Sequence, residues 1–201
     1  MLRRQRYLQA ALELFAAHGF VGTTTDMIVA QVGGSKATLY KYFPSKDDLI
    51  AGLMDRVVET MANRSAPEGL DEAPLADALT TLGTSLLRAV VSPGAVTLLR
   101  LCLGEFGRFP QLAQIVWEHG PAVTYADFAR FLDTRRSRGE LAVDDLQLAS
   151  EHFLAAIAGH IQLKVAMGMR EPPDEAEIAQ RVAAAVATFL ARYQTAPPSR
   201  R

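Results

Sequence analysis

Apolar residues recur at intervals of three and four through most of this 201-residue chain, and this spacing constrains the fold more than any other feature. Such a spacing places side chains on one face of an α-helix. No stretch alternates apolar and polar residues as cleanly as a half-buried β-strand does. The sequence therefore predicts an all-α fold of about nine helices, separated by glycine and proline.

Glycine, proline and capping residues set the expected helix boundaries. The first helix should end near residue 18, because Gly19 can cap it while Phe20 folds back onto Phe15. Two short helices should then occupy about residues 24–32 and 36–43. The remaining helices are expected from Ser45 onward, over 74–91, up to about 107, from Pro110 to Arg138 with Gly120-Pro121 inside, over 145–167 and over 174–193.

Composition limits the classes of function. A single cysteine, Cys102, excludes an internal disulfide, and four dispersed histidines without a second cysteine give no zinc spacing. We predict no metal and no cofactor. The apolar runs fall short of the ~20 residues that span a bilayer, and the N-terminus lacks the pattern of a signal peptide. The sequence predicts a cytoplasmic protein with no membrane partner.

The net charge of −1 hides an asymmetry along the chain. Residues 1–50 carry six Lys/Arg against four Asp/Glu, a net of +2, whereas the other 151 residues carry 15 against 18, a net of −3. A small basic module attached to a mildly acidic body favours a nucleic-acid partner.

The segment GGSKATLYKYFPSK, residues 33–46, has two possible functions. Its glycines and lysines suggest a nucleotide-phosphate loop, but such a loop needs lysine directly after the second glycine, and a hydroxyl after the lysine. Here Ser35 precedes Lys36 and Ala37 follows it, and the element before the loop is a helix instead of a strand. Two short helices joined by a glycine turn instead indicate a helix-turn-helix, whose second helix enters the DNA major groove.

The second short helix has a core face and a face suited to DNA. If Leu39 and Phe43 point to the core, the other faces carry cations, hydroxyls, a methyl group and phenols, which contact phosphates, base edges and thymine methyls. Tyr40 lies at the border, and it can bury its ring while offering its hydroxyl. The exposed set is Lys36, Ala37, Thr38, Lys41 and Tyr42. Thr25 and Lys46, each at the start of a helix, are placed for phosphates.

These residues resemble a known family. The stretch TTTDMIVAQVGGSKATLYKYFPSKDDL is similar to the DNA-binding module of TetR-family transcriptional repressors, T-T-x-x-x-I-A-x-x-A-G-V-S-x-x-x-L-Y-x-Y-F-x-S-K-x-x-L, over about residues 8–53. The resemblance implies that Thr24 and Thr25 begin the second helix, that Lys41 and Tyr42 follow the DNA backbone, and that Lys46 grips a phosphate. The resemblance also implies that the residues facing the major groove are Lys36, Ala37, Thr38 and Tyr40. The predicted DNA-binding residues are Thr24, Thr25, Ser35, Lys36, Ala37, Thr38, Tyr40, Lys41, Tyr42 and Lys46.

The chain departs from the family pattern in the turn and the second helix. Gly34 replaces the usual valine, and Val29 and Val32 replace small alanines. We expect neighbouring residues to compensate the packing of the turn.

The middle of the chain, which resembles the C-terminal domain of the AefR-like branch, is rich in aromatic residues. They could line a cavity for an apolar or aromatic effector, or they could simply be core residues. Cys102, in an apolar run, is expected to be buried and unreactive. The candidate effector-binding residues are Leu99, Cys102, Phe106, Trp117, Tyr125, Phe128 and His152.

The last two predicted helices are apolar on more than one face. Small residues such as Ala155, Ala156 and Gly159 allow close approach of a second backbone. The family resemblance implies that this helix pair forms a four-helix homodimer interface. The predicted organisation is a DNA-binding domain over 1–48, an effector-binding and dimerisation domain over 49–194, and a disordered tail over 195–201.

The predicted function is a ligand-responsive transcriptional regulator and not an enzyme. It would act as a repressor that binds a pseudo-palindromic operator as a homodimer until a small-molecule effector releases it. An activator and a ligand-independent regulator remain open as alternatives. A helical small-molecule carrier or enzyme is the alternative from another class, although no catalytic constellation supports it.

Overall fold

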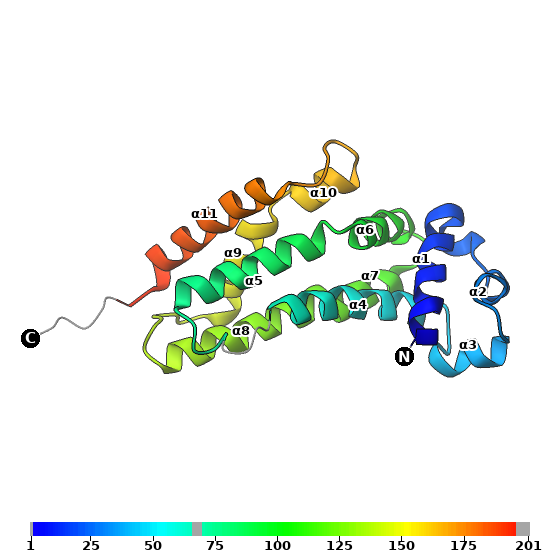
Figure 1. The fold of residues 1–201 in the computed structure, drawn as a ribbon, viewed down its shortest axis with the longest axis horizontal. Helices are drawn as coiled ribbons and strands as arrows, with labels where there is room; N and C mark the ends of the chain where they lie inside the picture. The colour runs from blue at the N-terminus through cyan, green and yellow to red at the C-terminus, as the bar shows by residue number, and fades with distance from the viewer. Residues whose placement is uncertain (1, 66–69, 196–201) are drawn as a thin grey trace, which may run out of the picture. The chain divides into compact units, whose positions relative to one another are not determined.

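The computed structural model describes residues 2–65 and 70–195 and confirms the all-α fold (Figure 1). Within these residues the only β-type pairing is an isolated bridge between Leu141 and Gln194. The described chain forms eleven helices: α1 (Leu2–Gly22), α2 (Thr25–Val32), α3 (Lys36–Tyr42), α4 (Asp47–Ser65), α5 (Leu75–Val90), α6 (Pro93–Glu105), α7 (Pro110–His119), α8 (Pro121–Ser137), α9 (Leu146–Ala158), α10 (Ile161–Ala166) and α11 (Glu175–Tyr193).

Two of the nine expected helices are each divided in two, which accounts for the difference in number. Gly120, with φ −128° and ψ −96°, separates α7 from α8 because the residue before a proline is disfavoured in helical conformation. Gly159, with φ +48° and ψ −135°, separates α9 from α10 in a conformation that favours glycine.

The chain packs into two units, and the first contains α1, α2, α3, the start of α4, α6 and α7 (residues up to 58 and 92–121). Helix α1 packs against α2 and α6. Gly19, at φ +71°, breaks the helical backbone of α1, so Phe20 turns back and its ring centroid lies 5.5 Å from that of Phe15. This confirms the predicted end of the first helix. Leu98, Cys102 and Leu112 of the later segment complete the same core.

The second unit contains the remaining helical segments of the described chain, with α5, α9 and α11 packed against one another (Figure 1). Its centre is aromatic: the Phe128 ring stacks on that of Phe153 at 4.8 Å, and Phe189 meets Phe153 edge-on at 5.2 Å. Gly83 of α5 permits close packing, because a Cβ there would lie 2.9 Å from Cδ1 of Ile157.

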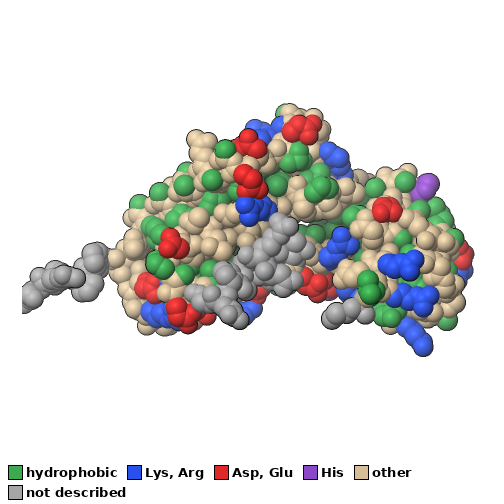
Figure 2. All heavy atoms as spheres, viewed as in Figure 1, with side chains coloured by type: hydrophobic (Ala, Val, Ile, Leu, Met, Phe, Trp, Pro, Cys, Tyr) green, Lys and Arg blue, Asp and Glu red, His purple; other side chains and the backbone are tan. Residues whose placement is uncertain are grey.

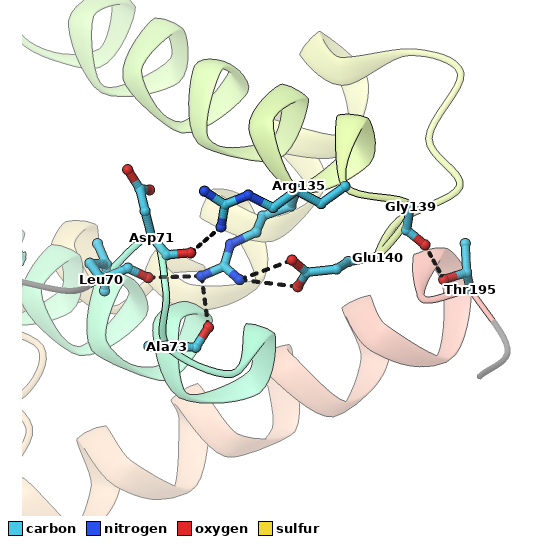
Figure 3. A network of polar contacts seen from close by, with 8 residues as sticks. Leu70, Asp71, Ala73, Arg135, Gly139, Glu140 and Thr195 are labelled. Carbon is cyan, nitrogen blue, oxygen red and sulfur yellow. Dashed lines mark hydrogen bonds and ion pairs between the residues drawn. The ribbon is translucent and has the colours of Figure 1, made fainter. Parts of the chain in front are cut away.

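A buried arginine ties the α4–α5 connection to the end of α8 (Figure 3). Arg135, whose side chain is 2% exposed, donates from Nη1 to both carboxylate oxygens of Glu140 at 3.2 and 3.0 Å. Its Nη2 donates to the carbonyls of Leu70 at 2.8 Å and Ala73 at 2.9 Å. The loop after α8 also holds the end of α11, because the amide of Thr195 donates to the carbonyl of Glu140 at 3.1 Å.

These units are defined by packing, whereas the boundary expected between residues 48 and 49 is one of function and stays a prediction. Apart from Thr195, the tail expected to be disordered lies outside the described residues. In the described chain no single helix is both long and apolar enough to cross a membrane. Helices α5 and α6 reach the length and mean hydropathy of a membrane span only when they are taken together as one broken helix.

Candidate nucleic-acid interface

Helix α2 begins and ends through local caps. Thr24 is the N-cap, and its side chain accepts a hydrogen bond from the amide of Met27 at 3.2 Å. At the other end Gly33, at φ +82°, donates its amide to the carbonyl of Val29 at 2.8 Å. Ile28 and Val32 are buried. The predicted start of this helix is confirmed.

Helix α3 has the two faces that the sequence predicts. Ser35 is its N-cap and accepts a hydrogen bond from the amide of Thr38 at 3.2 Å. Leu39 and Phe43 are 1% and 3% exposed, so one face belongs to the core. The opposite surface carries Lys36, Ala37, Tyr40, Lys41 and Tyr42, all exposed, with Thr38 half-buried. This face is available to a partner.

The glycine turn before α3 accommodates two side chains of α1. A Cβ at Gly34, where φ is +110°, would lie 2.8 Å from Nη2 of Arg3 and 3.3 Å from the hydroxyl oxygen of Tyr7. These groups take the space that the valine of the family pattern would need. Arg6 secures the other side of the turn by donating to the carbonyl of Val32 at 2.9 Å. The expected local compensation is therefore present.

Polar contacts link α2 to α3 across the exposed surface. Nζ of Lys36 lies 2.9 Å from a carboxylate oxygen of Asp26, and the hydrogen bond to that carboxylate is the main cause that raises the pKa of Lys36. The hydroxyls of Thr25 and Tyr40 lie 3.4 Å apart. These contacts restrict the positions of the Lys36 and Tyr40 side chains on the exposed surface.

Lys46 holds the connection between α1 and α2. Its ammonium donates to the carbonyls of Phe20 at 2.5 Å and Thr23 at 3.1 Å, and lies 4.3 Å from the centroid of the Phe20 ring. Burial lowers the pKa of Lys46, an effect that the carboxylates of Asp47 and Glu105 oppose. A role in gripping phosphate stays a prediction, and in this structure two of the three N–H groups already bind backbone.

Basic residues dominate part of the surface of the first unit. Figure 2 shows Lys and Arg side chains over the part of the visible face that belongs to the N-terminal helices. Sequence reasoning did not assign Asp26, Arg3 or Tyr7 to this region. The position of Asp26 was predictable in part, because it is a carboxylate in the first turn of a predicted helix. The positions of Arg3 and Tyr7 beside the glycine turn depend on the tertiary packing of α1 and were not predictable.

The seven candidate effector residues fall into two groups. Leu99, Cys102, Phe106 and Trp117 belong to the first unit, and Tyr125, Phe128 and His152 belong to the second. Cys102 is fully buried, as expected, and burial raises the pKa of its thiol to about 12. Trp117 is 55% exposed.

In the second unit, Phe128 belongs to the aromatic centre. His152 is exposed, and its Nδ1 lies 3.3 Å from the hydroxyl of Tyr193. An effector role for all seven stays a prediction.

Two families match the chain. Residues 8–53 match the bacterial regulatory proteins of the tetR family, and residues 77–195 match the AefR-like transcriptional repressor, C-terminal domain. The chain is 34% identical over 71 residues to the HTH-type transcriptional repressor AcnR of Corynebacterium diphtheriae, and 38% identical over 63 residues to the nucleoid occlusion factor SlmA of Vibrio cholerae. These alignments cover 35% and 31% of this chain and 37% and 32% of the relatives, about a third of their length.

Solved structures match over nearly the whole chain. The flavonoid-responsive regulator FrrA is 33% identical with a TM-score of 0.77, covering 97% of this chain and 98% of FrrA. A regulator from Mesorhizobium loti is 24% identical with a TM-score of 0.81, covering 96% and 97% of the two chains, and shares the fold.

Proposed function

Because the chain belongs to the TetR family, whose members are DNA-binding transcriptional regulators and not enzymes, we propose that it is an effector-released repressor. The supporting observation is the exposed face of α3, where Lys36, Tyr40, Lys41 and Tyr42 surround Ala37 while Leu39 anchors the helix in the core. In the cytoplasm, a homodimer would place two such helices in successive major grooves of a pseudo-palindromic operator, about 34 Å apart.

Small residues exposed on α9 and α11 support the homodimer. Helices bury small side chains where another backbone approaches closely, and a second copy supplies such a partner by two-fold symmetry. In the second unit these residues are exposed to solvent although α9 and α11 already pack against each other and α5. The exposed small residues are Ala155, Ala156 and Gly159 of the α9 segment and Ala183, Ala184, Ala187 and Ala191 of α11.

We propose an apolar or aromatic effector, for which the first unit and the second unit each supply candidate residues. FrrA is described as flavonoid-responsive, which supports an aromatic ligand for a related chain. Binding would favour a conformation with lower operator affinity, with a coupling of about 1–3 kcal/mol as in typical allosteric proteins.

Operator binding is tested by fluorescence anisotropy with DNA from upstream of the gene and a scrambled duplex of equal length. We expect salt-sensitive binding that favours the upstream sequence, weakened by Lys41→Ala and unchanged by Arg130→Ala, an exposed arginine of α8. Operator recognition would be contradicted if the protein bound the upstream and scrambled duplexes with equal affinity at every salt concentration, and bound fragments selected from the genome no more tightly. In a reporter strain, higher transcription with the protein than without it would indicate an activator.

The dimer is tested by sedimentation at micromolar concentration. Ala187→Glu places a charge on the proposed interface and should give a monomer, whereas Ala126→Glu on the exposed surface of α8 should not. A wild-type monomer would refute the homodimer. Release is tested by adding flavonoids and simpler aromatic compounds to the operator complex, and an effector should lower operator affinity about 5- to 150-fold.

A further inference from the structure

Two side chains of α1 fill the space beside Gly34, one residue before the N-cap of α3. A Cβ at Gly34 would lie 2.8 Å from Nη2 of Arg3 and 3.3 Å from the hydroxyl oxygen of Tyr7, so both groups point at the same place. The ring of Tyr42, on the exposed face of α3, has its centroid 6.2 Å from that of Tyr7. Arg3 and Tyr7 therefore adjoin the surface proposed to contact DNA.

The hydroxyl of Tyr7 lacks a partner. The Tyr7 side chain is 0% exposed, and no group in the described chain forms a hydrogen bond with its hydroxyl. Most buried polar groups in native proteins are paired, and an exception calls for an explanation such as an absent ligand. The position of Tyr7 in the core explains the burial of the ring but leaves the hydroxyl unexplained.

Arg3 brings positive charge to the neighbourhood of Gly34 and Tyr7. It is exposed and forms no hydrogen bond or ion pair with any residue in 2–65 or 70–195. A guanidinium has five N–H donors and no acceptor, so it cannot accept the hydroxyl proton of Tyr7. Both groups can donate at this place, and an anionic oxygen would satisfy them with charge-assisted hydrogen bonds.

We propose that Arg3 and Tyr7 form a binding site for a DNA phosphate, next to the end of α3 that enters the major groove. Arg3 moves with the incoming phosphate, whose oxygen then accepts a hydrogen bond from the Tyr7 hydroxyl. Gly34 has no Cβ and so leaves room for Arg3 and Tyr7 beside the turn, which explains why the chain has glycine where the family pattern has valine. This proposal rests on the function proposed above and adds two residues to its DNA surface.

The decisive variant is Tyr7→Phe, because it removes only the hydroxyl. If the hydroxyl has no partner in any state, its removal leaves operator affinity unchanged. If it binds phosphate, affinity falls about tenfold, as expected for one hydrogen bond to a charged group, while the urea unfolding midpoint does not fall. Tyr193→Phe, which removes a hydroxyl from α11, is the matched control and should leave affinity unchanged.

Arg3→Ala tests the charge of the site. The slope of log affinity against log salt should become shallower by about 0.9, the change expected for one phosphate contact, on operator and scrambled DNA alike. The double variant should lose less affinity than the two single losses combined, because both groups bind one phosphate. These variants avoid substitution of Gly34, where any side chain is strained.

The outcomes separate the site from the function. Wild-type protein that binds no DNA even at low salt refutes both, whereas selective wild-type binding that Tyr7→Phe and Arg3→Ala leave unchanged refutes the site alone. Inorganic phosphate, titrated against the wild type and followed by tyrosine fluorescence, tests another source of the same anion. A saturable response below about 10 mM that Tyr7→Phe abolishes would assign the site to a free anion and overturn the DNA assignment. We expect none, because an ion pair with the exposed Arg3 is weak in water.

Discussion

Replacement of Arg135 by methionine should destabilise the second unit by about 3 kcal/mol, because the guanidinium is buried and makes four hydrogen bonds. Methionine retains an apolar stem but has no donors. The carbonyls of Leu70 and Ala73 would lose their Arg135 partner, and an acceptor left unsatisfied costs about 1–3 kcal/mol. Both residues are half-buried, so water reaches them in part and the lower end, about 1 kcal/mol each, applies.

The remaining cost comes from Glu140. Its side chain is 32% exposed, so its carboxylate can be partly rehydrated after the guanidinium is lost, and we assign it about 1 kcal/mol. The total of ~3 kcal/mol is a large part of the 5–15 kcal/mol that stabilises a typical domain. Glu140→Gln should also destabilise, because it leaves the guanidinium buried without a counter-charge.

Urea unfolding followed by circular dichroism measures this loss. All variants should be compared at one protomer concentration, because the stability of a dimer depends on it. With a slope of about 2 kcal/mol per molar urea, a loss of ~3 kcal/mol lowers the midpoint by about 1.5 M. Arg130→Met, at an exposed ion pair of α8, should change stability by less than about 0.5 kcal/mol. If Arg135→Met cost no more than Arg130→Met, the buried network would not stabilise the unit.

Three further outcomes follow from the first unit. Lys46→Met should lower the free energy of unfolding by about 1–2 kcal/mol, measured in urea, because two backbone carbonyls before α2 lose a charged donor. Cys102 should make the free energy of unfolding fall by up to about 1.4 kcal/mol per pH unit as the pH rises above 9. The thiol of the unfolded chain ionises there, whereas the buried thiol keeps its proton to about pH 12. Cys102→Ala should lack this extra fall. Asp26→Asn should strengthen binding to DNA of any sequence a few-fold, because it removes a negative charge and releases Lys36; unchanged affinity in anisotropy titrations would show that the pair has no influence on binding.

Local chemistry explains what the sequence predicted correctly. The core-facing pair Leu39 and Phe43 depends on neighbours within four residues, so its position followed from spacing. The two carbonyl partners of Arg135 lie 62 and 65 residues away in the chain, and periodicity carries no information about such contacts.

The candidate site was predictable to a similar degree. The exposed face of α3 followed from its two buried residues, Leu39 and Phe43, whereas the approach of α1 to the glycine turn did not. Arg3 and Tyr7 meet Gly34 only because α1 packs beside the turn. Lys46 is a further case: its position at a helix start suggested a phosphate, yet its nearest acceptors are carbonyls of a connection more than 20 residues earlier.

The discontinuous first unit determines when its core can form during synthesis. Leu98, Cys102 and Leu112 belong to the same core as Phe15 and Leu39, so a nascent chain that ends at residue 58 lacks part of that core. At about 5–20 residues per second, the ribosome needs some 3–10 s more to reach Leu112. The DNA-binding helices therefore emerge first but complete their packing only after α5 has been synthesised, and during that interval a chaperone or protease meets an unfinished module.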